Sequence, residues 1–344
     1  MTNYYYFEKY LENSLSNSNS FQNYSKIEKK LSKEYYNDFK EQLLVKYENK
    51  SFNEVLDSKV SKIAHGDVLK ISKKEKINFN IKDNDFKAQL NNNLKLLPKI
   101  GLKSEQKLKK EGYNTIESLK NHDTHSENAT KFLSKIDEMD YFEIVESLNK
   151  NKYSPDCMNN ILKSISLVGD EDFKFMDIET KGLSNVPIIL IGVAEIKKSN
   201  IIVSQYFLRD YTDEENIIEA YLSHLDENSV HVTFNGKTFD IPFIKNRCSY
   251  YRIEHNLDLP HIDLRYFSKN LWGDTLVNCK LQTIEREIFN INRINDVPGK
   301  YIPDFYDTYL QKDNIGPVVP IIEHNAQDII SLAYFLNKMY EEVN

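Results

Sequence analysis

Residues 173–180, Phe-Lys-Phe-Met-Asp-Ile-Glu-Thr, are the stretch that decides the fold of this chain. Apolar residues lead into two acids, Asp177 and Glu179, which are two positions apart. Side chains alternate between the faces of a strand, so both carboxylates point to the same side, about 7 Å apart along the chain. Acids at the end of a buried strand are costly unless a cation neutralises them. Because carboxylate oxygens suit Mg²⁺ or Mn²⁺, we predict a divalent metal site here.

The residues that follow alternate between two hydrophobic patterns. Short apolar runs are typical of strands, and longer amphipathic runs are typical of helices. The strands are expected at 173–177, 187–195, 201–208, 230–234 and 261–264, and the helices at 213–225, 239–251 and 321–342. Three strands in a meander, followed by alternating helices and strands, predict an α/β domain over residues 169–344 with a mixed sheet covered by helices.

Two later motifs carry further acids. In Asn235-Gly236-Lys237-Thr238-Phe239-Asp240, the aspartate falls in the first turn of a helix, where the dipole favours a carboxylate. His324 and Asp328 are four residues apart and therefore share one face of the last helix. Taken alone, each motif is typical of ordinary surface residues, so its meaning depends on the combination.

Together, Asp177-x-Glu179, Asn235 to Asp240 and His324-x-x-x-Asp328 resemble the motifs of the DEDD 3′–5′ exonuclease superfamily. Residues 173–340 are most similar to its YprB-type ribonuclease-H-like family. The resemblance implies a ribonuclease-H-like fold and hydrolysis of phosphodiester bonds in DNA or RNA at two ions of Mg²⁺ or Mn²⁺. It also implies that the four acids are the metal ligands and that the histidine is the base.

The spacing of the last motif leaves the identity of the base open. The histidine subclass of these exonucleases has His five residues before the final Asp, and the tyrosine subclass has Tyr four residues before it. Here His324 stands four residues before Asp328, and Glu323 stands five before it. One helix position rotates a side chain by about 100°, so either residue is a candidate for positioning the water.

Polar residues near the second motif are candidates for contact with nucleic acid. Asn235 either contacts substrate or anchors its loop, and Lys237 and Arg265 are either phosphate contacts or surface charge. Asp263, on the expected strand 261–264, either supports the site or caps a loop. We predict that Asn235 and Lys237 bind nucleic acid.

Residues 91–168 are expected to form a helical region. The turn Ile100-Gly101-Leu102, with a helix from Lys103 to Gly112 and another from Thr115, resembles a helix-hairpin-helix module. Glycine lets the backbone approach a phosphate, and the next helix presents free N–H groups. We therefore expect Gly101, Lys103 and Lys107 to bind nucleic acid. The alternative is a helical linker with a solvated lysine face, and the family's frequent second glycine is replaced by Lys99.

The remaining sequence gives coarser predictions. Residues 1–90 are expected to be helical at 4–15 and 24–47, with a small β element at 59–82. A net charge of −7 excludes a wholly basic nucleic-acid coat protein. The three cysteines show no metal or disulfide spacing, no apolar run reaches membrane length, and residues 1–12 are too polar for a signal peptide. These features predict a soluble cytoplasmic protein.

The leading functional prediction is a metal-dependent nuclease, specifically a 3′–5′ exonuclease. Two alternatives stay open: a binding or scaffold protein that has lost activity on this fold, and a structure-selective endonuclease. The presence of all four acids argues against lost activity. No polymerase-like sequence follows Asp328, so we expect no polymerase in the same chain.

Overall fold

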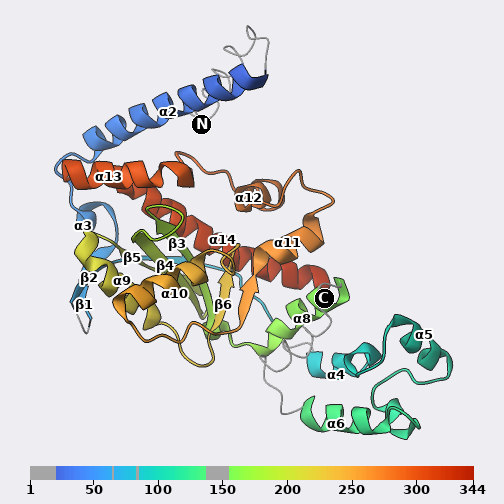
Figure 1. The fold of residues 1–344 in the computed structure, drawn as a ribbon. Helices are drawn as coiled ribbons and strands as arrows, with labels where there is room; N and C mark the ends of the chain where they lie inside the picture. The colour runs from blue at the N-terminus through green and yellow to red at the C-terminus, as the bar shows by residue number, and fades with distance from the viewer. Residues whose placement is uncertain (1–20, 64–65, 83–84, 137–154) are drawn as a thin grey trace.

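A seven-stranded mixed sheet forms the centre of the computed structural model, which describes residues 21–63, 66–82, 85–136 and 155–344 (Figure 1). The strand order is β1-β2-β5-β4-β3-β6-β7. The strands are β1 (Ser58–Lys62), β2 (Asp67–Lys76), β3 (Phe173–Thr180), β4 (Ile188–Lys197), β5 (Asn200–Phe207), β6 (Val230–Thr233) and β7 (His261–Asp263). β3, β4 and β5 form the antiparallel meander, and β6 and β7 pair in parallel with their neighbours. The predicted mixed α/β architecture is confirmed.

Helices cover both faces of this sheet, because the strands are buried on both sides. One face packs against α9 (Glu214–Leu222) and α10 (Asp240–Tyr251) through residues of the first apolar cluster. α13 (Ile302–Lys312) contacts Phe207 of β5 through the rings of Tyr306 and Tyr309. The other face packs against α8 (Pro155–Ser164), α11 (Leu264–Trp272), α12 (Leu281–Phe289) and the long α14 (Val319–Val343) through the second cluster. α14 lies directly on β3, β4 and β5, which brings the last motif of the chain to the first.

The small β element expected at 59–82 does not stand apart from the later domain. β2 pairs antiparallel with β5 along residues 69–76, and β1 pairs with β2. Without β2, the backbone groups on one side of β5 would form an open sheet edge. The division of the chain at residues 90 and 168 stays a prediction. The sheet, however, combines β1 and β2, which precede residue 90, with β3 to β7, which follow residue 168.

The N-terminal helix α2 (Phe21–Lys46) lies against α13 and spans nearly the same residues as the predicted helix 24–47 (Figure 1). The Ser32 and Tyr301 hydroxyls are 2.7 Å apart, and the Tyr36 and Tyr301 ring centroids are 4.4 Å apart. A short helix, α3 (Phe52–Val55), connects α2 to β1. The helix expected at 4–15 lies outside the described residues.

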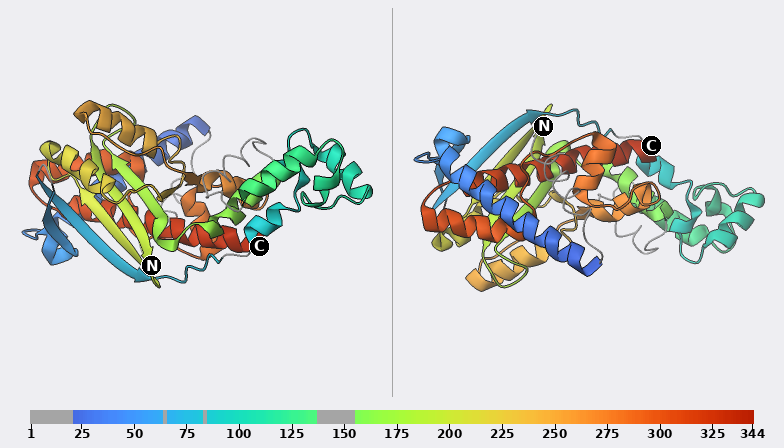
Figure 2. Two further views of the ribbon diagram at one scale, coloured as in Figure 1. Left: turned by 90° about the horizontal axis from the view of Figure 1, so that it is seen from below. Right: turned by 90° about the horizontal axis from the view of Figure 1, so that it is seen from above.

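A separate group of short helices projects from the sheet (Figure 2). It contains α4 (Phe86–Leu90), α5 (Leu102–Lys110) and α6 (Ser126–Ile136) around a small apolar cluster that includes Ile100 and Leu108. α5 begins at Leu102, one residue before the predicted start, with Gly101 at its N-cap. The helix expected from Thr115 is instead a single 3₁₀ turn, Ser118–Asn121. The helix-hairpin-helix assignment therefore stays a prediction.

Lys99 has a φ of 67°, in the left-handed region that favours glycine. This is the position where the helix-hairpin-helix family often has its second glycine, so the backbone keeps the conformation although the residue differs. A lysine carries this conformation at a steric cost that glycine avoids.

Among the described residues, no helix is both long and apolar enough to cross a membrane.

Candidate metal and catalytic centre

Asp177 lies in the middle of β3 and is held from α14. It pairs with Gly192 on β4, which in turn pairs with Gln205 on β5. Asn325 of α14 donates from Nδ2 to Asp177 Oδ2 at 2.8 Å and to the Asp177 carbonyl at 3.1 Å. Gln205 donates to Asn325 Oδ1 at 2.8 Å. A Cβ on Gly192 would lie 2.2 Å from Asn325 Oδ1, so glycine is what lets the helix approach.

Asp240 reaches the same place from the opposite face of the sheet. It is the first residue of α10, where the positive end of the helix dipole favours a carboxylate. Its side chain is buried, and Oδ1 accepts a hydrogen bond from the Ile178 N–H at 3.2 Å. Because Ile178 stands between Asp177 and Glu179, this bond ties the second motif to the first.

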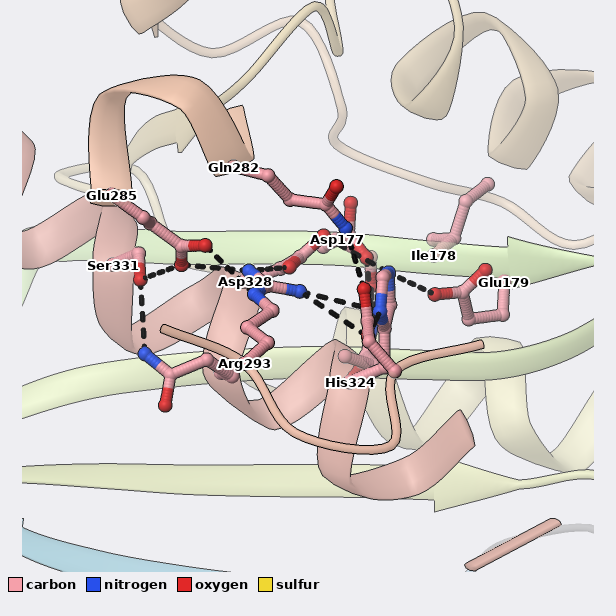
Figure 3. Close-up of polar contacts among 12 residues, drawn as sticks. Asp177, Ile178, Glu179, Gln282, Glu285, Arg293, His324, Asp328 and Ser331 are labelled. Carbon is pink, nitrogen blue, oxygen red and sulfur yellow. Dashed lines mark hydrogen bonds and ion pairs between the residues drawn. The ribbon is translucent and has the colours of Figure 1, made fainter. Parts of the chain in front are cut away.

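The last motif brings His324 and Asp328 of α14 to the same acids (Figure 3). His324 Nε2 lies 3.7 Å from Glu179 Oε1 and 3.5 Å from Asp328 Oδ2. Glu323 is exposed, and in the described part of the chain no hydrogen bond or ion pair joins it to these acids. The structure thus brings the histidine, rather than the glutamate at the alternative spacing, to the carboxylates.

Three charged residues in and after α12 complete the centre, and the sequence analysis missed them. Arg293 donates from Nε and Nη2 to the two oxygens of Glu285, each at 2.7 Å, and forms an ion pair with Asp328 Oδ1 (Figure 3). His324 Nδ1 bonds to Asp296. Glu285 is fully buried on α12. An acid among the apolar residues of this helix was therefore the feature of the sequence that could have indicated the network.

The pKa values of the acids show how strongly they crowd one another. Burial raises the pKa of Asp177 well above its usual range, and Asp328, Asp240 and Glu179 add to the effect. Burial also raises the pKa of Glu179 to about 8 and that of Asp240 to about 7. Without a further cation, the folded centre therefore holds protons that these carboxyls would ordinarily lose.

His324 is shifted in the same direction by its acidic neighbours. Burial alone lowers the pKa of this imidazole, but Asp328, Asp296 and Glu179 outweigh burial and raise the pKa to about 10. The His324 imidazolium thus faces Glu179 and Asp328, and the Arg293 guanidinium faces Asp328.

The donor set fits a hard divalent cation. Four carboxylates from β3, α10 and α14 supply oxygen ligands, and one of them, Asp328, already faces a cation through its ion pair with Arg293. In the described ranges, however, no three His, Cys, Asp or Glu side chains are gathered closely enough to hold an ion. The chemistry and charge of the site therefore fit a metal. In this structure Arg293 and His324, rather than a metal ion, pair with acids of the site.

The predicted nucleic-acid contacts fall in two places. Asn235 and Lys237 lie in the loop before Asp240, and Asp263 accepts from both of their backbone N–H groups, at 2.7 and 3.1 Å. Asp263 therefore caps this loop, one of the two roles expected for it. Gly101, Lys103 and Lys107 are exposed on the projecting α5 region, away from the acids (Figure 2).

Two comparisons with known proteins find relatives of this chain. The RNase_H_2 family model, described as RNase_H superfamily, matches residues 174–340. The "Uncharacterized protein YprB" of Bacillus subtilis (strain 168) is 31% identical over 163 residues. That match covers 46% of this chain but only 39% of the relative. The chain therefore spans about two fifths of the length of the curated relative.

Proposed function

We propose that this chain, whose residues 174–340 form a domain of the RNase H superfamily, is a metal-dependent 3′–5′ exonuclease acting on DNA or RNA. Superfamily membership indicates a nuclease with a nucleic-acid substrate, and nucleases of this kind generally use divalent metal ions. The observation that supports the finer proposal is that β3, α10 and α14 bring two buried acids, Glu179 and Asp240, to the half-buried Asp177 and Asp328 and to His324.

Asp177, Glu179, Asp240 and Asp328 would hold two ions of Mg²⁺ or Mn²⁺. When bound, such ions polarise the phosphate and stabilise the charge on the attacking and leaving oxygens. Asn325 keeps Asp177 in place through two hydrogen bonds, at 2.8 and 3.1 Å. This support fixes the carboxylate geometry before substrate arrives, which a catalytic centre requires.

In this proposal His324 takes the proton from the attacking water. Asp296 bonds to Nδ1 and leaves Nε2, which faces Glu179 and Asp328, as the atom that meets the water. The pKa of about 10 keeps the imidazole charged while the acids are uncompensated. His324 can therefore act as a base only when the charge of these acids is offset, which couples proton transfer to assembly of the centre.

The test is cleavage of 5′-end-labelled DNA and RNA oligonucleotides in the presence of Mg²⁺ or Mn²⁺. We expect products that shorten stepwise from the 3′ end. Asp177→Asn should lower the rate by about 10³-fold or more, since metal-assisted charge stabilisation is worth several kcal/mol. Asp258→Asn, a change at an exposed acid paired with Lys245, is the matched control and should leave the rate unchanged.

Each outcome has a definite meaning. If wild type and Asp177→Asn leave every substrate equally intact, the nuclease proposal fails. Internal products from the first time point would replace the exonuclease reading with endonucleolytic cleavage. Stepwise products that are unaffected by Asp177→Asn would mean that the carboxylates described above are not the catalytic centre.

A further inference from the structure

The catalytic centre does not use an open hollow of about 490 Å³ beside the loop that follows β6. Its lining comes from this loop, from α11 and from the start of α12. The lining residues are Phe234, Asn235, Arg265, Lys269, Asn278, Cys279, Lys280 and Leu281. We propose that this basic hollow binds a backbone phosphate of the nucleic-acid strand, an inference that rests on the proposed function.

The charge of the basic hollow is opposite to that of the chain. Arg265, Lys269 and Lys280 line it, and no carboxylate is among its lining residues. The whole chain carries a net charge of −7, so three cations without an acid are a local reversal of sign. Within the described ranges, none of the three side chains forms an ion pair, which leaves their charge available to an anion.

The two amide side chains in the hollow also favour an anion. Asn235 Oδ1 accepts from the guanidinium of Arg265. Asn278 Oδ1 accepts from the Lys280 N–H at 3.0 Å and from the Thr283 hydroxyl at 2.8 Å. Because both amide oxygens are engaged, the NH₂ groups are the ends left for a ligand, and they are donors.

The walls of the hollow are fixed relative to one another by one buried carboxylate. Asp263 accepts from the backbone N–H groups of Asn235 at 2.7 Å and of Arg265 at 3.2 Å. The loop and the first turn of α11 are thereby held together, so the site exists without a ligand. The nine-residue α12 begins at Leu281, and the positive end of its dipole adds to the field in the hollow.

The basic hollow is close enough to the acids to hold the same strand. Asn235 and Asp240 are five residues apart, which limits their separation to about 17 Å, or about five nucleotides at a 3.4 Å rise. The turn between them is shorter than this limit, because the Ile241 N–H bonds to the Gly236 carbonyl at 3.1 Å. A strand with its scissile bond at the acids can therefore have a neighbouring phosphate in the hollow.

The test measures binding of a labelled single-stranded oligonucleotide to the full chain in EDTA, by fluorescence anisotropy over a range of salt concentrations. The variant is Lys269→Gln with Lys280→Gln, because the side-chain amines of these lysines bond to no described residue and the change should not disturb the fold. We expect the slope of log K against log salt to fall by about 0.7, the value for the loss of one phosphate contact on a single strand.

The matched control replaces exposed lysines outside the hollow, Lys198→Gln with Lys312→Gln, and removes the same charge. Its slope should stay at the wild-type value. A hollow variant with the wild-type slope overturns the proposal, as does an equal fall in the control, which would mean nonspecific attraction only. Inorganic phosphate is the second probe: if it binds at the hollow while the oligonucleotide slope is unchanged by the substitutions, the site takes the free anion and not a strand.

This experiment separates the hollow from the proposed function. Binding in EDTA requires no cleavage, so a chain that cuts no substrate can still show the change in slope. Conversely, if the chain degrades oligonucleotides but the hollow variant keeps the wild-type slope, the nuclease proposal stands and the proposal for the basic hollow fails.

Discussion

Replacing Arg293 with glutamine would remove the cation that faces a fully buried acid, Glu285, and a half-buried one, Asp328, at once. The guanidinium bonds both oxygens of Glu285 and pairs with Asp328, and its own side chain is only 10% exposed. Glutamine is shorter and uncharged, so it leaves Glu285 fully buried without a cation. Asp328 would then face the other acids with His324 as the cation left beside it among the described residues.

The expected cost follows from these contacts. Breaking a buried ion pair by removing one partner costs about 3–5 kcal/mol, because the remaining charge is left uncompensated. Glu285 also accepts from the Ser331 hydroxyl, which offsets part of the loss. We therefore expect the free energy of unfolding of Arg293→Gln at pH 7 to fall by about 3 kcal/mol, near the lower end of that range.

Urea unfolding in metal-free buffer, followed by circular dichroism, measures this change. The control is Arg286→Gln on α12, whose side chain is 55% exposed and pairs only with exposed Glu287. The control should change stability by less than about 0.5 kcal/mol. If Arg293→Gln costs less than about 1 kcal/mol, or no more than the control, then Arg293 does not hold the acids together and the reasoning is refuted.

Three further predictions concern the same centre. Burial raises the pKa of Glu179 from 4.5 to about 8, so the folded protein keeps a proton that the unfolded chain loses. Stability of the metal-free protein should therefore fall as pH rises from about 5 to 8, and urea midpoints should show a smaller fall for Glu179→Gln. His324→Ala should lower the cleavage rate by about 10²–10⁴-fold and Glu323→Ala by less than twofold; the reverse order would assign proton transfer to Glu323. Gly192→Ala would place a methyl 2.2 Å from Asn325 Oδ1 and should cost about 1–3 kcal/mol in urea unfolding. An unchanged midpoint there would mean that α14 shifts freely over β4.

The sequence predicts the sheet well where a strand has a distinct hydrophobic pattern. The apolar runs of β3, β4 and β5 and the amphipathic pattern of α14 identify these elements, because each buries a face set by its own periodicity. The three acidic motifs were also found, since each lies in such an element or directly beside one. The meeting of Asp177, Asp240 and Asp328 then follows from the topology.

Contacts that depend on irregular backbone were beyond prediction. Arg293 lies between α12 and α13, in a segment where Asn290 and Asn295 have left-handed φ values of 54° and 59°. No periodicity relates such a segment to α14, so its pairing with Asp328 is visible only in three dimensions. By contrast, Gly192 inside an apolar strand was a readable signal of close approach, although it does not say what approaches.

The place of β2 beside β5 has a consequence for how the chain is made. Lys76 precedes its partner Asn200 in sequence by 124 residues. At about 5–20 residues per second, a ribosome needs about 6–25 s to synthesise that interval. During this time the edge of β2 that will pair with β5 has no partner strand, and the lysines at 70, 73, 74 and 76 give β2 a charged surface that discourages pairing with other chains. These lysines would thus protect the nascent protein from aggregation.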